Sequence, residues 1–167
     1  MSARNTGRSF FEAKSAFYKK SLGRYTQLPS STGNAAPVEV LHGVWLGARE
    51  GEADAASLRD KGITHILQVA CEVQPTHANA AGFTYMNIPV LDIEEQDLVG
   101  LFPECFPFME SAIQQGGGVL VHCVAGVSRS ASVVLGYVMW KQRLALPAAM
   151  AALRALRPAV NPHLGFR

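Results

Sequence analysis

The sequence predicts an α/β fold, because short β-branched runs alternate along the chain with longer segments of helical character. The run Val119–Val121 is typical of a buried strand, and the apolar segment Ala131–Trp140 is long enough for a buried helix. The nine residues His122–Ser130 join the two and therefore form a strand-to-helix turn. In open α/β sheets such turns lie at the carboxyl ends of strands, where ligands bind.

The other predicted elements lie on both sides of this turn. The strands are Val38–Leu41, Val44–Gly47, Ile63–Ala70 and Phe83–Val90, and the helices are Ala53–Lys61, Leu101–Gln115 and Pro147–Arg157. Gly62 ends the first of these helices, and Pro158 stops the last. Pro103 and Pro107 predict an early interruption of the middle one.

Length and composition indicate one globular body. The chain has 167 residues, 17% of them charged, and its net charge of +2 argues against nucleic acid as a partner. No apolar run is long enough to span a membrane, so we expect no membrane partner. Three cysteines make no disulfide framework. We therefore expect a monomer in a reducing compartment, the cytoplasm, with the nucleus as the alternative.

The N-terminal segment differs from the rest in charge. Residues 1–24 hold six basic side chains and a single acidic one, Glu12. We expect a basic segment and linker over residues 1–36, containing a short amphipathic helix at Ser9–Lys20, and a folded domain that contains the turn His122–Ser130 over residues 37–167. Three interpretations of the basic segment remain: a helix packed on the domain, a docking arm for an acidic partner, or an organelle transit peptide.

The turn His122–Ser130 contains the residues expected of a phosphate site. Five residues separate Cys123 from Arg129, and a loop of that length can direct its N–H groups to one point beside a helix N-terminus. Gly126 allows positive φ or a close backbone approach. The positive potential of the loop N–H groups and the helix N-terminus should favour the thiolate of Cys123. The planar guanidinium of Arg129 would hold two phosphate oxygens. The combination suggests attack on phosphorus with a phosphocysteine intermediate. The expected phosphate-binding residues are Val124, Ala125, Gly126, Val127, Ser128 and Arg129.

The pattern His-Cys-x-x-Gly-x-Ser-Arg-Ser at His122–Ser130 resembles the signature loop of cysteine-dependent protein tyrosine phosphatases, and its ending resembles the dual-specificity branch. The resemblance covers roughly Val38–Phe166. It implies a protein tyrosine phosphatase-like fold, with a central mixed, mainly parallel sheet flanked by helices. It also implies a small atypical member or an isolated catalytic domain. Most members have Asn at the positions of Gln68 and His163. Members also continue beyond the position of Arg167, which leaves a trimmed form of a longer protein as one interpretation of this chain.

A general acid is needed to protonate the leaving oxygen. Four carboxylates, Asp92, Glu94, Glu95 and Asp97, follow the apolar run that ends at Leu91. The family places an Asp about thirty residues before the Cys, and Asp92 lies 31 residues before Cys123. We expect Asp92 to act as the general acid in the first step and as the general base in the second. Glu94 or Asp97 is the alternative acid. The interpretation without a catalytic role is that the four carboxylates form an acidic loop that faces solvent.

The resemblance also implies supporting roles for two neighbours of the nucleophile. The Ser130 hydroxyl would hydrogen-bond the departing Cys123 thiolate, and His122 would brace the loop and help to set the state of the thiol. A buried structural histidine is the other interpretation of His122. Ser128 should support the loop by hydrogen bonding. No cluster has metal-ligand spacing and no nucleotide-binding glycine pattern occurs, so we expect no metal and no cofactor.

The expected substrate is a phosphoprotein, because the loop's variable residues Val124, Ala125 and Val127 are neutral, whereas phosphoinositide phosphatases of this superfamily tend to carry Lys there. The resemblance implies hydrolysis of phosphotyrosine and of phosphoserine and phosphothreonine, with protein kinases, mitogen-activated ones among them, as a substrate class. The alternatives are a phosphatase of a non-protein substrate and a catalytically silent phosphopeptide-binding module. A thiol reductase would need a resolving cysteine close to Cys123 in sequence, and none is there.

Cys71 raises the question of redox control. It follows a strand predicted to lie beside the catalytic strand, and some family members rescue an oxidised nucleophile through a disulfide to such a cysteine. A disulfide would require Cα atoms within about 7 Å. The simpler interpretation is that Cys71 is a small buried hydrophobic residue.

Overall fold

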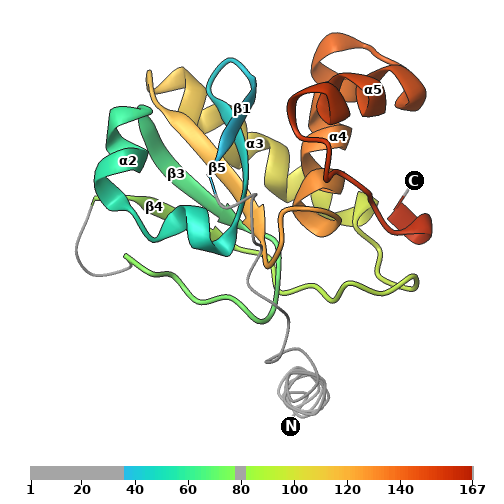
Figure 1. Ribbon diagram of the computed structural model, residues 1–167, viewed down its shortest axis with the longest axis horizontal. Helices are drawn as coiled ribbons and strands as arrows, with labels where there is room; N and C mark the ends of the chain where they lie inside the picture. Colours follow the sequence, from blue (N-terminus) through green and yellow to red (C-terminus); the bar gives the residue numbers. More distant parts are fainter. Residues whose placement is uncertain (1–35, 78–81, 167) are drawn as a thin grey trace, which may run out of the picture. The chain divides into compact units, whose positions relative to one another are not determined.

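The computed structural model describes residues 36–77 and 82–166 (Figure 1). Its five strands are β1 (Val38–Leu41), β2 (Val44–Ala48), β3 (Ile63–Gln68), β4 (Thr84–Asn87) and β5 (Gly118–Cys123). They form one sheet in the order β1-β2-β5-β3-β4, in which β1 is antiparallel to β2 and the other pairs are parallel. The expected mixed, mainly parallel sheet is confirmed. The expected helix at Ser9–Lys20 lies outside the described residues, and the domain boundary near residue 36 stays a prediction.

The helices divide between the two faces of the sheet. They are α2 (Ala55–Asp60), α3 (Phe102–Gln114), α4 (Arg129–Gln142) and α5 (Leu146–Leu156), with short 3₁₀ turns η1 (Arg49–Glu52), η2 (Val99–Leu101) and η3 (Leu164–Phe166). Helix α2 begins where the Asp54 side chain accepts a hydrogen bond from the Ser57 N–H at 3.0 Å. Its Leu58 packs with Ile66 and Leu120 on one face of the sheet. Helices α3, α4 and α5 cover the other face.

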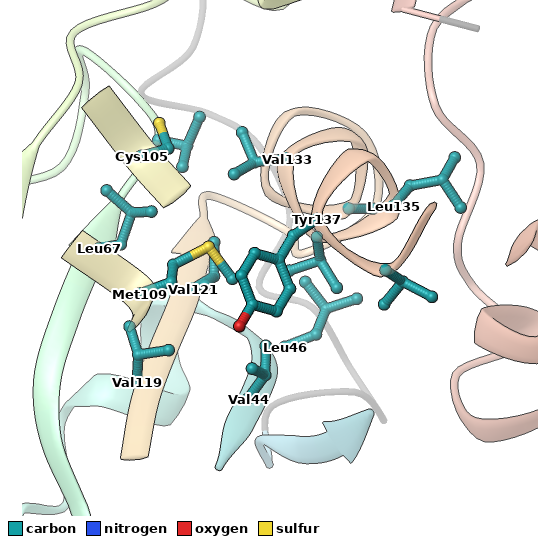
Figure 2. Packing of buried hydrophobic residues seen from close by; sticks show 14 of the residues in the cluster. Val44, Leu46, Leu67, Cys105, Met109, Val119, Val121, Val133, Leu135 and Tyr137 are labelled. Atoms are coloured by element: carbon teal, nitrogen blue, oxygen red, sulfur yellow. The ribbon is translucent and has the colours of Figure 1, made fainter. Parts of the chain in front are cut away.

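The alternation of side chains along β5 explains both cores. Val119 and Val121 point into the larger core, and Leu120 between them points to the α2 side. In the larger core Tyr137 of α4 lies beside Met109 of α3, over the side chains of β2 and β5 (Figure 2). Because β5 is the middle strand and is buried on both faces, its carboxyl end is held rigidly where the nine-residue turn begins.

The most informative differences from the expected elements concern α3, β3 and β4. Helix α3 is not interrupted. Pro103 lies in its first turn, where N–H groups lack intrahelical partners, and Pro107, inside the helix, removes only the one hydrogen bond to the carbonyl of Pro103. Strands β3 and β4 end two and three residues early. Beyond these ends the chain still makes hydrogen bonds, among them those from the Val69 N–H to the His122 carbonyl and from the Ile88 N–H to the Gln68 carbonyl, both at 2.8 Å.

Among the described residues, no helix combines the length and the apolar character needed to cross a bilayer.

Candidate active site

Cys123 is the last residue of β5, and its side chain lies at the bottom of the loop that leads into α4. The residue is 2% exposed. Its Sγ accepts hydrogen bonds from the Ser130 hydroxyl at 3.2 Å and from the Gly126 N–H at 3.3 Å. Two donors therefore converge on one buried sulfur. This arrangement stabilises a negative charge on the sulfur more than it stabilises a neutral thiol.

Gly126 is the point at which the loop reverses direction. Its φ is +67°, and a Cβ there would collide with the carbonyl group of Gly47. Both facts require glycine at this position. The guanidinium of Arg157, 1% exposed, donates to the Gly126 carbonyl at 3.1 Å and to the Ala125 carbonyl at 3.3 Å. The loop carbonyls are thereby drawn outward toward Arg157.

The other loop residues are held by neighbouring segments. The Val124 carbonyl accepts from the Arg49 N–H at 3.2 Å, and the Val127 carbonyl accepts from the Asn161 N–H at 2.9 Å. Ser128 is buried, and its hydroxyl accepts from the His163 N–H at 3.1 Å. The sequence predicted the loop, but these partners lie more than thirty residues from it in sequence, so local patterns do not reveal them.

Arg129 is the first residue of α4 and is 2% exposed. Its Nη1 donates to the Val90 carbonyl at 3.2 Å and lies 2.6 Å from Oε2 of Glu72. Burial disfavours the charged guanidinium, but the negative charge of Cys123, followed by that of Glu72, outweighs this effect and raises the pKa of Arg129. Its Nε is buried and has no hydrogen-bond partner among the described residues. Nη1 of the guanidinium therefore contacts acceptors within the protein, whereas its Nε N–H is available to donate to a bound anion.

Asp92 lies against this loop, as its spacing from Cys123 suggested. The Ser128 hydroxyl donates to its Oδ1 at 2.7 Å, and its Oδ2 is 3.8 Å from Nε of Arg129. Its side chain is 31% exposed, so it can meet both solvent and a bound molecule. A hollow opens beside it, lined by Asp92, Val127, Ser128, Asn161, Pro162, His163 and Leu164. Of the alternative acids, Glu94 is exposed and Asp97 binds the Gly100 N–H at 2.9 Å.

His122 is fully buried beside Cys123 on β5. Its Nε2 lies 2.7 Å from Oε2 of Glu52, and its Nδ1 lies 3.1 Å from the carbonyl oxygen of Cys123. The sequence pointed to His122 but not to Glu52, whose carboxylate is 1% exposed. One signal could have led to it: Gln68, which stands where most of the resembled family has Asn, donates to the same Oε2 at 2.8 Å.

Comparison with known proteins agrees with this geometry. The family model described as "Dual specificity phosphatase, catalytic domain" matches residues 44–167. The chain belongs to the dual specificity phosphatase family. Within this family it is 40% identical over 121 residues to dual specificity protein phosphatase 19 of Mus musculus, covering 72% of this chain and 54% of that one. It is 38% identical over 128 residues to dual specificity protein phosphatase 1B of Arabidopsis thaliana, covering 77% and 75%.

Solved structures place this dual specificity phosphatase domain among small relatives. The structure of DUSP15 superposes with a TM-score of 0.75 at 37% identity, covering 81% of this chain and 84% of that one. The human tyrosine phosphatase-like serine/threonine/tyrosine-interacting protein gives 0.72 at 30% identity, covering 78% and 90%. The resemblance seen in the sequence and the protein tyrosine phosphatase-like fold are both confirmed. The matched region spans about half of the mouse relative's length.

Proposed function

We propose that this dual specificity phosphatase domain hydrolyses phosphate monoesters on phosphoproteins, with Cys123 as the nucleophile. The observation that carries the proposal is the convergence of two donors, the Ser130 hydroxyl and the Gly126 N–H, on the Cys123 sulfur at the start of a helix. The buried Arg129 beside it supplies the positive charge that a phosphate dianion needs. Anion site and nucleophile thus share one loop.

In the first step the Cys123 thiolate attacks phosphorus, an S–P bond forms, and the bond from phosphorus to the substrate oxygen breaks. The leaving oxygen takes a proton from Asp92. Arg129 and the N–H groups of the loop hold the phosphoryl oxygens, where the transition-state charge collects. The contact from Ser128 to Oδ1 of Asp92 holds this carboxyl group over the loop.

In the second step water attacks the phosphocysteine and gives its proton to Asp92, which the first step left ionised. The S–P bond breaks, inorganic phosphate leaves, and the electron pair returns to Cys123. The Ser130 hydroxyl, 3.2 Å from the sulfur, donates to the departing thiolate and so makes it a better leaving group.

The proposed substrates are phosphotyrosine and phosphoserine or phosphothreonine in proteins. Family membership supports this range, and the neutral residues Val124, Ala125 and Val127 support it further, because they offer no extra cation to a polyphosphorylated lipid. Mitogen-activated protein kinases are the first substrates to test, on the strength of the sequence resemblance alone.

The experiment is phosphate release from an aryl phosphate, followed by a panel of peptides phosphorylated on Tyr, Ser or Thr. We expect turnover by the wild type and none by Cys123→Ser, which should still bind a phosphopeptide because Arg129 and the loop remain. Cys105→Ser is the matched control, since that cysteine is buried in α3 in the larger core. Turnover by Cys123→Ser within tenfold of wild type would remove Cys123 from its role. Binding without wild-type turnover would favour the silent phosphopeptide-binding module.

A further inference from the structure

A buried carboxylate lies on the far side of His122 from the nucleophile. Glu52 ends η1, the turn that follows β2, and it is 1% exposed. Its Oε1 accepts from the Thr76 N–H and the Tyr85 hydroxyl, each at 2.7 Å. Its Oε2 accepts from Gln68 at 2.8 Å and lies 2.7 Å from Nε2 of His122. Oε1 therefore faces two donors, and Oε2 faces one donor and a ring nitrogen of His122.

These contacts keep Glu52 charged. Burial alone would raise the pKa of its carboxyl group, but the contacts with His122, Tyr85, Thr76 and Gln68 outweigh burial and lower that pKa to about 2. Tyr85, Thr76 and Gln68 are neutral donors at neutral pH. His122 is therefore the partner in this set that can balance the carboxylate charge.

An oxygen atom lies close to each ring nitrogen of His122. Nε2 lies 2.7 Å from Oε2 of Glu52, at an ion-pair distance and without the alignment of a hydrogen bond, and Nδ1 lies 3.1 Å from the carbonyl oxygen of Cys123. A neutral imidazole has one N–H and one lone pair, so it would place a lone pair against one of these two oxygens. Only the imidazolium can make both contacts attractive.

Other charged groups around this pair come from several elements. His77, in the loop after β3, lies with Nε2 2.7 Å from the main-chain oxygen of Glu52. Arg129 of α4 is paired with Glu72 and lies near Asp92. Arg157, after α5, binds carbonyls of the nucleophile loop. These groups surround Cys123 or the backbone of Glu52, whereas the Glu52 carboxylate contacts the His122 ring itself.

We propose that Glu52 is a positioning residue that keeps His122 in the imidazolium form, so that its charge stabilises the Cys123 thiolate. The inference rests on the proposed function, because it assigns the thiolate a use. Glu52 would act through His122 and, being buried, would not contact the substrate.

Alkylation of Cys123 by iodoacetamide as a function of pH tests the proposal, because only the thiolate reacts. Peptide mapping separates Cys123 from the other two cysteines. In Glu52→Gln the imidazolium loses its partner charge, so the midpoint of Cys123 alkylation should move to higher pH by on the order of one unit. The acidic limb of kcat/KM should move with it. This assay needs no turnover, so its failure is distinguishable from failure of the proposed function.

Three variants separate the charge effect from a structural one. Glu50→Gln removes a carboxylate from the same turn, where its side chain is 31% exposed beside Arg49, and should leave the midpoint unchanged. Tyr85→Phe removes a donor to Glu52 but no charge, so it should lower stability without moving the midpoint. His122→Gln should reproduce the upward shift, and adding Glu52→Gln to it should produce no further shift.

A folded Glu52→Gln whose midpoint is unchanged or moves to lower pH overturns the proposal, since a downward shift would mean that the carboxylate itself opposes the thiolate. If Glu52→Gln does not fold, His122→Gln decides in the same way: no upward shift overturns the proposal. Glu52→Asp keeps the charge and should keep the alkylation midpoint closer to wild type than Glu52→Gln does.

Discussion

Nη1 of Arg129 lies 2.6 Å from Oε2 of Glu72, and the two side chains are only 3% and 7% exposed. The same Nη1 donates to the Val90 carbonyl at 3.2 Å. These two contacts hold the guanidinium through Nη1 and leave its Nε N–H without a hydrogen-bond partner among the described residues. Glu72 is thus an anchor for the residue proposed to bind the phosphate.

Glu72→Ala should lower kcat/KM for a phosphopeptide by roughly 10–100-fold, because a misplaced Arg129 no longer meets the phosphoryl oxygens. Glu72→Gln keeps an acceptor for Nη1 and should lose less. Steady-state kinetics on both variants, with thermal unfolding as a check on folding, provide the measurement. Equal losses in the two variants would show that the charge of Glu72, and not its hydrogen bond, is what matters.

Arg129→Lys should reduce kcat/KM by roughly 10²–10³-fold, the usual cost of removing a donor that holds transition-state charge. A lysine ammonium is a point charge and cannot reproduce the planar fork. Inorganic phosphate should also inhibit this variant less strongly than it inhibits the wild type. Activity within threefold of wild type would show that the fork is not used.

Asp92→Asn should reduce kcat by roughly 10²–10⁴-fold on substrates with poor leaving groups, and much less on an activated aryl phosphate that leaves without a proton. Comparing the two substrate types gives the measurement. Asp97→Asn is the matched control, because its carboxylate binds the Gly100 N–H instead of the loop. If the graded loss appeared in Asp97→Asn or in Glu94→Gln, the acid would be another residue of the same segment.

Glu52 should also contribute to acid denaturation. Its pKa is about 2 in the folded protein against an ordinary value of 4.5, so the unfolded chain binds the proton more tightly. Its contribution to stability is therefore complete above about pH 5 and is lost as pH falls toward 2, a total of about 3 kcal/mol. Urea unfolding between pH 3 and 7 should show a shallower pH dependence for Glu52→Gln than for wild type. Parallel curves would contradict the linkage.

Mild peroxide should oxidise Cys123 while Cys71 remains a free thiol. Burial, and then the charge and hydrogen bond of Glu72, raise the pKa of Cys71 to about 12, so it supplies almost no thiolate to attack an oxidised Cys123. Peptide mapping after peroxide treatment tests this, with Cys105 as the control. A Cys71–Cys123 disulfide, with activity restored by added thiol, would instead establish redox protection through Cys71.

Local sequence was enough to predict the strand-to-helix turn because the nine residues His122–Ser130 are contiguous, and their strand and helix flanks are strongly apolar. The position of Asp92 beside this loop was predictable only with the family's spacing, and its role as acid stays a prediction. The anchors of the site were not predictable in this way. Glu52 and Glu72 lie 70 and 57 residues before the side chains they contact, and a carboxylate in an unpatterned loop is normally solvated.

Arg157 illustrates the same limit from the other end of the chain. Its sequence context, a basic residue before Pro158 at the end of a helix, is typical of a helix C-terminus facing solvent. Only the packing of α5 beside α4 brings its guanidinium to the carbonyls of Ala125 and Gly126. Helix α3 shows the reverse case. Its two prolines predicted an interruption near the start of the helix, but the helix is continuous.

The order in which these parts leave the ribosome follows from the same contacts. The thiol at Cys123 is synthesised before Arg157, Asn161 and His163, whose groups hold the outer side of its loop. At about 5–20 residues per second, those partners follow the cysteine by roughly two to eight seconds. During that interval the nascent chain carries the proposed nucleophile without the residues that hold its loop, so phosphatase activity should appear only after the last of these residues has emerged.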